Sequence, residues 1–321
     1  EPVVLKTKLT EEEIARFLVN QVKFPGVILE TKLVRNYPYE NSFSSVLGYV
    51  GRINEQELSR LDKNYQASHF IGKNGIEKYY EDILHGDVGY QQVEIDATGR
   101  SVRVLKQTLP VAGDNLYLTI DSKLQTVAEQ AFAGNRGAAV AIDPNNGEVL
   151  AMVSNPSFNP NLFVLGISSK DYQALQNAPE KPLYNRVIRG LYPPGSTIKP
   201  FMALAGLSSG LITPEFTISD PGYFQLSNHT YRDWQKKGHG RVNMSKAIMQ
   251  SCDTYFYTLA SRIGISRMDT MLWSFGFGKP TNIDVTDELS GLVPSPAWKK
   301  RVKGESWYPG DTVITGIGQG F

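Results

Sequence analysis

Hydrophobic and polar positions follow two different patterns along the chain. Up to about residue 110 the sequence is polar, with short alternating stretches between closely spaced glycines. Thr10 followed by three glutamates predicts a helix start, because threonine caps helices and acids favour the first turn. Residues 27–34, 92–95 and 100–107 alternate or run apolar, as strands do. This part predicts a strand-rich unit.

Beyond residue 110 the apolar spacing becomes mainly helical. Residues 122–132 are amphipathic, and residues 137–142 and 148–153 flank a Pro-Asn-Asn-Gly turn. This predicts a helix followed by a hairpin whose apolar strands are covered on both faces. Further helices are expected at 169–176, from 196 onward, and at 244–249, 253–263 and 268–275. We predict an α+β (or α/β) protein with helices on an antiparallel sheet.

Length and composition set the outer limits. The 321 residues suffice for two domains, which we place at residues 1–110 and 111–321. The net charge of +1 gives no reason to expect a nucleic-acid partner. No apolar run of about eighteen residues occurs, and Cys252 is the only cysteine, so no intramolecular disulfide can form. Both ends lie inside apparent domains, so we expect a fragment.

The first chemical signal is the run YPPGSTIKP at residues 192–200, which holds the one Ser-x-x-Lys of the chain. A serine hydroxyl needs a base to become a nucleophile, and positions i and i+3 share a helix face. Ser196 and Lys199 could therefore form a nucleophile–base pair. The preceding prolines and Gly195 predict a helix start at Ser196, whose backbone donors could form half an oxyanion hole. Pro200 predicts a local distortion. One such match is also expected by chance.

Two later segments could complete a site. Ser251 and Asp253 flank one residue before an apolar helix, where they could simply cap it. Alternatively, Ser251 could relay a proton to a leaving amine. Gly318, Gln319 and Gly320 could let backbone approach a ligand closely, or could form only a turn.

A metal site is a further hypothesis. Asp220, Asp233, His239 and Cys252 are acceptable zinc ligands on loops between the first two motifs. His229 is the substitute if one aspartate is wrong. The alternative is a small buried cysteine, a loop histidine and two turn aspartates.

These segments together resemble a known family. YPPGSTIKP at 192–200, SCD at 251–253 and GIGQG at 316–320 are similar to the active-site motifs of penicillin-binding transpeptidases. The non-catalytic pedestal of the class B members is resembled by GKNGIEKYY at 72–80 and LHGDVG at 84–89. Class B as a whole is also matched by DPNNGEVLA at 143–151 and SNPSFNP at 154–160. NLF at 161–163, GISSKDY at 166–172, YRDW at 231–234 and GHG at 238–240 resemble the elongation, or rod-shape, branch. The resemblance covers essentially the whole chain.

The resemblance implies a serine β-lactamase-like transpeptidase domain behind an N-terminal pedestal or dimerisation-like domain. It implies D,D-transpeptidation of peptidoglycan, with Ser196 attacking a stem pentapeptide and Lys199 taking the proton. Ser251 would relay a proton, with Asp253 beside it. The substrate would lie along Gly318, Gln319 and Gly320. β-Lactams would acylate the same serine. No cofactor is required for this chemistry, and a zinc ion would be structural.

The resemblance also implies a cellular location and partners, and the sequence differs from the family's pattern in two places. It implies a membrane anchor, the periplasmic face of a bacterial inner membrane, a membrane glycosyltransferase partner and shape-determining partners. The family's third motif, Lys-Ser/Thr-Gly, is absent, so we expect the chain to stop before it. Asp253 replaces the commoner asparagine, which places a possible negative charge beside Lys199. The competing functions are a catalytically impaired scaffold of the elongation complex and a β-lactam sensor or β-lactamase.

Overall fold

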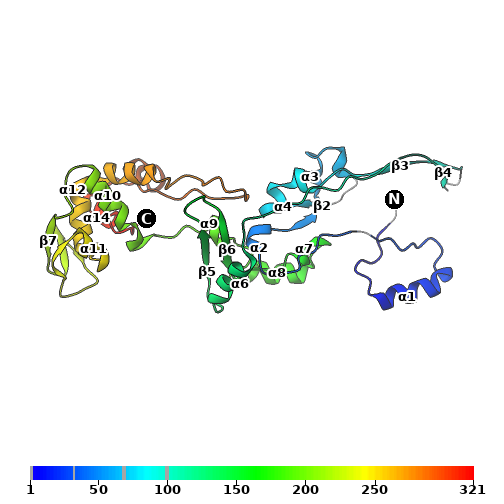
Figure 1. Ribbon diagram of the computed structural model, residues 1–321, viewed down its shortest axis with the longest axis horizontal. Helices are drawn as coiled ribbons and strands as arrows, with labels where there is room; N and C mark the ends of the chain where they lie inside the picture. Colours follow the sequence, from blue (N-terminus) through cyan, green and yellow to red (C-terminus); the bar gives the residue numbers. More distant parts are fainter. Residues whose placement is uncertain (1–2, 32, 67–69, 98–100) are drawn as a thin grey trace. The chain divides into compact units, whose positions relative to one another are not determined.

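The chain forms two compact units in this computed structural model, which describes residues 3–31, 33–66, 70–97 and 101–321. The first unit comprises Glu1–Arg189 together with Asp284–Asp287. The second comprises Gly190–Ile283 and Glu288–Phe321. Both units combine helices with two-stranded antiparallel sheets (Figure 1). The predicted mixture of helix and antiparallel strand is thus present in each.

The first unit contains short helices and three of the strand pairs, β1–β2, β3–β4 and β5–β6. In chain order its elements are α1 (Glu11–Asn20), η1 (Gln21–Lys23), α2 (Ser44–Leu47), β1 (Val50–Arg52), α3 (Glu55–Leu58), η2 (Lys63–Gln66), β2 (Phe70–Gly72), α4 (Gly75–Tyr79), α5 (Glu81–Leu84), β3 (Tyr90–Ile95), β4 (Ser101–Thr108), α6 (Ser122–Ala131), β5 (Gly137–Ile142), β6 (Val149–Asn155), α7 (Asn161–Val164), α8 (Ser169–Asn177) and α9 (Arg186–Arg189).

Local signals account for α1. Thr10 accepts a hydrogen bond from the Glu13 backbone N–H at 3.2 Å, and the Glu13 carboxylate accepts one from the Thr10 N–H at 3.0 Å. This capping box confirms the predicted helix. In contrast, none of the residues that the structure describes between 27 and 34 lies in a strand. The strand predicted there is wrong, because alternation cannot hold a strand without a partner to bond.

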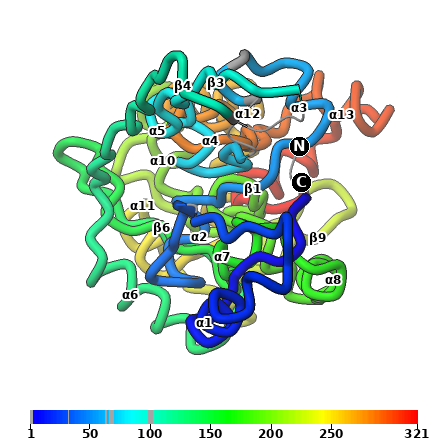
Figure 2. The backbone as a smooth tube through the Cα atoms, turned by 90° about the vertical axis from the view of Figure 1, so that its right-hand side faces the viewer, coloured from blue at the N-terminus to red at the C-terminus, as the bar shows by residue number. Residues whose placement is uncertain are grey.

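The predicted hairpin of β5 and β6 is confirmed, with Ala139 opposite Val153. Gln125 of α6 fixes the helix to β6, because its buried amide accepts from the Met152 N–H at 2.8 Å and donates to the Met152 carbonyl at 3.0 Å. The path of β6 beside α2 and α6 can be followed in Figure 2. Alternate residues of β5 are exposed, whereas the consecutive residues 151–154 of β6 are all buried, so the expected cover on both faces is present for β6 and wrong for β5.

A buried polar cluster ties the N-terminal loop of the first unit to α4. The hydroxyl of Tyr37, which is 4% exposed, donates to Glu77 at 3.0 Å and accepts from the Val50 N–H at 2.9 Å. Arg35 completes the cluster with Nε 2.8 Å from the same Glu77 oxygen. The Tyr37 hydroxyl and both carboxylate oxygens of Glu77 therefore have partners, as buried polar groups require.

Among the described residues, the second unit holds two strand pairs and the 22-residue element α12. Its elements are η3 (Gly195–Ile198), α10 (Lys199–Ser208), β7 (Thr217–Asp220), β8 (Tyr223–Leu226), β9 (His229–Arg232), β10 (Gly240–Asn243), α11 (Met244–Met249), α12 (Asp253–Ser274), α13 (Pro296–Lys303) and α14 (Pro309–Thr315). β7 pairs with β10, and β8 with β9.

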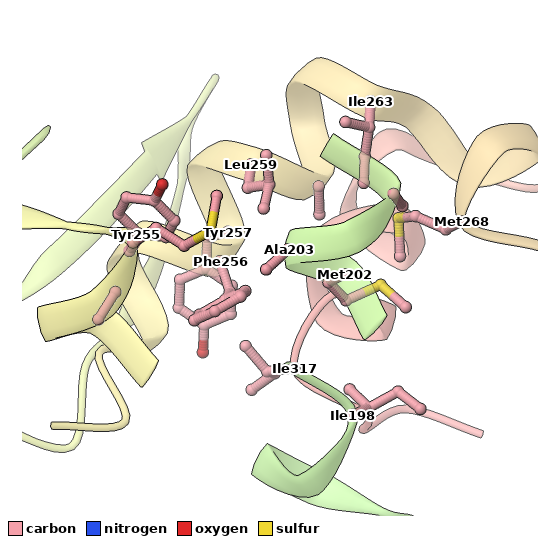
Figure 3. Packing of buried hydrophobic residues seen from close by; sticks show 14 of the residues in the cluster. Ile198, Met202, Ala203, Tyr255, Phe256, Tyr257, Leu259, Ile263, Met268 and Ile317 are labelled. Atoms are coloured by element: carbon pink, nitrogen blue, oxygen red, sulfur yellow. The ribbon is translucent and has the colours of Figure 1, made fainter. Parts of the chain in front are cut away.

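Helix α12 is the centre of the second unit and packs against both α10 and α14 (Figure 1). Figure 3 shows its buried side chains, among them Phe256, Leu259 and Ile263, meeting Met202 and Ala203 of α10. All five are at most 3% exposed. The dense core fixes the start of α10 relative to the start of α12, and the candidate site is built at these two helix starts.

Candidate active site

Ser196 lies in the 3-10 turn η3, directly before α10. The predicted helix is present, but its α-helical part begins at Lys199, three residues later than expected. Pro200 falls in the first turn of α10, where its missing N–H has no partner to lose. The turn leaves Ser196 exposed, while the Lys199 side chain points into the core and the residue is 1% exposed. An exposed hydroxyl thus sits beside a buried amine.

A hydrogen-bonded chain connects these residues with the start of α12. Lys199 Nζ donates to Ser251 Oγ at 3.0 Å, to the Ser251 carbonyl at 2.9 Å and to Asp253 Oδ1 at 2.6 Å. The Ser251 hydroxyl in turn donates to Ser196 Oγ at 2.8 Å. The path from Lys199 to Ser196 therefore runs through Ser251, whereas the Ser-x-x-Lys spacing suggested a direct contact.

The helix-cap explanation for Ser251 and Asp253 is wrong. Cys252 occupies the N-cap position of α12 and makes no side-chain capping bond, and Asp253 is the first helical residue. The Ser251 and Asp253 side chains face Lys199 instead. Ser251 also has a left-handed backbone, with φ of 54°, which is uncommon for a serine.

The glycine-rich segment lies against the turn that carries Ser196. The Gly195 N–H donates to the Gly318 carbonyl at 3.0 Å. Gly318 has φ of +69°, and a Cβ there would overlap the Gly195 carbonyl, so no side chain fits. Gln319 and Gly320 are exposed beyond this contact, and their role in binding substrate stays a prediction.

The four candidate metal ligands form one cluster, in which one ligand atom from each lies within 4.8 Å of all the others. His239 Nδ1 is 2.7 Å from Asp220 Oδ2 and 3.7 Å from Asp233 Oδ1. Cys252 Sγ is 3.4 Å from Asp220 Oδ2. His229 lies on β9 with its ring against Tyr231, and is not part of the cluster.

Burial and hydrogen bonding shift the pKa values of Asp220 and Cys252 in this cluster. Burial alone would raise the pKa of Asp220, but hydrogen bonds from His239 and from the Gly222 N–H outweigh it and lower that pKa. Burial, reinforced by Asp220 and Asp233, raises the pKa of the Cys252 thiol. His239 Nε2 is buried and has no hydrogen-bond partner among the described residues. These donors suit a divalent cation, because a cation would offset buried carboxylates and favour a thiolate.

Trp234 is a residue to which the sequence assigned no role, although it belongs to the YRDW run at 231–234. Its indole Nε1 donates to the carbonyls of Gln250 and Ser251, both at 3.2 Å. Its ring meets His239 edge-on, with ring centroids 5.4 Å apart. Its place in that run, directly after Asp233, was the signal that could have identified it.

The fold and site agree with what comparison to known proteins finds. Residues 137–320 match a family model described as the penicillin binding protein transpeptidase domain, and residues 1–118 match the penicillin-binding protein dimerisation domain. The chain belongs to the penicillin-binding protein transpeptidase family, which confirms the fold and the resemblance. The exact domain boundary near residue 110 stays a prediction.

Individual relatives place the chain more narrowly. It is 52% identical to the peptidoglycan D,D-transpeptidase MrdA of Acinetobacter baumannii, over 100% of this chain and 48% of the relative. The Escherichia coli K12 protein of that name is 49% identical, over 99% of this chain and 52% of the relative. The chain thus spans about half the length of these curated relatives.

Solved structures give the same picture. Pseudomonas aeruginosa PBP2 in complex with WCK 5153 is 51% identical with a TM-score of 0.83, over 91% of this chain and 61% of that one. Helicobacter pylori PBP2 in complex with MreC is 38% identical with a TM-score of 0.88, over 97% and 58%. Among the described residues, no helix is both long and apolar enough to cross a membrane.

Proposed function

We propose that the protein is a peptidoglycan D,D-transpeptidase that acts through a Ser196 acyl-enzyme during cell elongation. The observation that carries this proposal is the chain of contacts from Lys199 Nζ through Ser251 Oγ to Ser196 Oγ, at 3.0 and 2.8 Å. It joins an exposed nucleophile to a buried base, as serine acyl transfer requires. The relatives' printed activity supports the same reaction.

The geometry suggests how the proton moves. Ser196 Oγ attacks the carbonyl carbon of the terminal D-Ala–D-Ala bond of a stem pentapeptide, while its proton passes to Ser251 Oγ and the Ser251 proton passes to Lys199 Nζ. The tetrahedral intermediate then collapses, and the same path returns a proton to the departing D-alanine amine. An amine from a neighbouring stem attacks the acyl-enzyme, which forms the crosslink and frees Ser196.

Asp253 sets the starting state of this path. Its carboxylate lies 2.6 Å from Lys199 Nζ, and both groups are largely buried. Lys199 Nζ must be a neutral amine to take the Ser251 proton, so one proton has to leave it first, and Asp253 Oδ1 is the base in contact that can take this proton. The family's commoner asparagine would not impose this charge.

The wider setting follows from the family. β-Lactams acylate Ser196 in place of the stem peptide. The protein works at the periplasmic face of the inner membrane, with a membrane glycosyltransferase and shape-determining proteins as partners. Support comes from the printed titles of similar structures, one a PBP2–MreC complex and one a peptidoglycan synthase complex.

Labelled penicillin tests the enzyme proposal. Incubation with the intact protein should give one covalent adduct that mass spectrometry places on Ser196. Ser196→Ala should abolish it, while the matched control Ser245→Ala, on an exposed position of α11, should label like the parent. An intact protein without an adduct would favour the scaffold alternative. An adduct that hydrolyses within seconds would favour a β-lactamase.

A second proposal concerns the acid–histidine–cysteine cluster. We propose that Asp220, Asp233, His239 and Cys252 hold a structural zinc ion, each with one atom. Asp220 and Asp233, at 2% and 5% exposure, place two buried carboxylates beside a single imidazole, and the Cys252 thiol next to them is 0% exposed. One nitrogen, one sulfur and two oxygens are ligands that zinc accepts in a four-coordinate site.

Metal analysis tests this second proposal. Purified protein should contain about one equivalent of zinc per chain, and Cys252→Ser should lose most of it. The matched control His229→Ala should retain the metal, because His229 lies outside the cluster. Zinc-free parent protein would end the proposal.

A further inference from the structure

We propose that Trp234 is a positioning residue that holds Ser251 in the orientation needed for proton relay. The inference rests on the proposed transpeptidase function. It adds a residue that contacts neither the nucleophile nor the base, and it names the atom through which that residue acts. That atom is the backbone carbonyl oxygen of Ser251, which accepts from Trp234 Nε1 at 3.2 Å.

The backbone of Ser251 needs such a restraint. Its φ of 54° lies in the left-handed region, where a residue with a Cβ persists only if its surroundings hold it. The direction of the Cα–Cβ bond, and with it the position of Ser251 Oγ between Ser196 and Lys199, follows from that backbone. Releasing the backbone would move the hydroxyl out of the chain of hydrogen bonds.

Asp233 and Trp234 restrain the segment 251–254, which carries Ser251, at both ends. Trp234 Nε1 binds the Ser251 carbonyl at the front of the segment, and Asp233 Oδ2 accepts from the Thr254 N–H at 2.9 Å three residues later. Asp233 itself is 5% exposed and sits in the candidate zinc cluster. Two adjacent residues thus connect that cluster to the relay serine from both sides.

The Trp234 contact is not explained by burial. The residue is 62% exposed, so its ring contributes little to the core. Indole has a single donor and no acceptor, and here that donor points at the carbonyls of Gln250 and Ser251. Lys199 Nζ also donates to the Ser251 carbonyl, but Lys199 changes its protonation state during the reaction. The indole N–H does not, so it holds the carbonyl throughout the cycle.

The test removes the N–H and keeps the ring. Trp234 is replaced by phenylalanine and, in a second variant, by 3-(3-benzothienyl)alanine, which keeps the indole shape without the donor. Acylation of the intact protein by labelled penicillin is followed at several concentrations, so that the affinity of the first complex and the acylation rate constant are separated. The matched control is Trp273→Phe, another exposed tryptophan of the same unit, whose ring faces Lys279 with Nζ 5.7 Å from the ring centroid.

The expected result is a roughly tenfold fall in the acylation rate constant for both Trp234 variants, as the loss of one hydrogen bond predicts, with unchanged affinity, melting temperature and zinc content. In a Ser251→Ala background the Trp234 replacements should change the rate by less than twofold, because Trp234 acts through Ser251.

Two results would overturn the inference. One is a benzothienyl variant that acylates at the parent rate, and the other is a Trp234 effect that stays undiminished without the Ser251 hydroxyl. Failure of the parent itself to form a Ser196 adduct would instead refute the proposed function.

Discussion

The two units differ in how much of their apolar surface they bury. In the second unit, Leu259 and Phe256 are 0% exposed in a continuous core that carries the Ser196 site. In the first unit, α1 buries no residue, β3 is exposed along its length, and Val22 is 96% exposed. The candidate catalytic side chains thus lie in the unit whose packing is dense enough to hold them in position. The open elements are free to serve as contact surfaces.

The largest expected effect tests that packing difference. Leu259→Ala should lower the free energy of unfolding of the second unit by about 2–5 kcal/mol, because it leaves a cavity beside α10. Val22→Ala should change stability by less than about 0.5 kcal/mol, because its side chain is already in solvent. Denaturant unfolding with hydrogen exchange resolved along the chain would measure both. Equal losses in the two variants would contradict the comparison.

A smaller effect is expected at the buried polar cluster of the first unit. Tyr37→Phe removes the hydroxyl that serves Glu77 and the Val50 N–H, and should lower stability by about 1–3 kcal/mol. Tyr39→Phe is the matched control, because Tyr39 is 60% exposed and its ring packs against Phe43. If both variants unfold alike in a thermal melt, the cluster does not anchor this unit.

The smallest effect is a pH dependence in the same unit. Burial raises the pKa of Glu81, although the Gly72 N–H at 2.7 Å works against the shift. The folded form therefore binds this proton more tightly, and the resulting stability is present at low pH and lost as pH rises through the folded pKa. Glu81→Gln should remove that loss.

The measurement is the stability difference between parent and Glu81→Gln, followed from about pH 4, just below the ordinary glutamate pKa, to neutrality. The Gln variant should gain on the parent as pH rises. Glu55→Gln, at an exposed position of α3, should keep a constant difference. A constant difference at Glu81 would show that its burial has no energetic consequence.

Local information was enough to predict much of the fold. The Thr10–Glu13 capping box, the β5–β6 turn and the helix after Ser196 all depend on neighbouring residues, and all are present. The stretch at 27–34 failed because an alternating pattern needs a pairing strand that the sequence does not specify.

The residues of the site could be predicted from the sequence, but the hydrogen bonds between them could not. Motif spacing brought forward Ser196, Lys199 and Ser251, but the route from Lys199 to Ser196 through Ser251 depends on contacts between residues more than fifty positions apart. Trp234 was missed for the same reason. The indole N–H of Trp234 reaches the Ser251 carbonyl because the loop after β9 places Trp234 beside it.

The contact between Gly195 and Gly318 restricts how this site can change over generations. Both glycines have positive φ, and at Gly318 any side chain would collide with the neighbouring backbone. A side chain at Gly318 would displace the turn that presents Ser196, and under the proposed function it would impair acylation by substrate and by drug alike. Variants that escape an acylating drug should therefore keep Gly318.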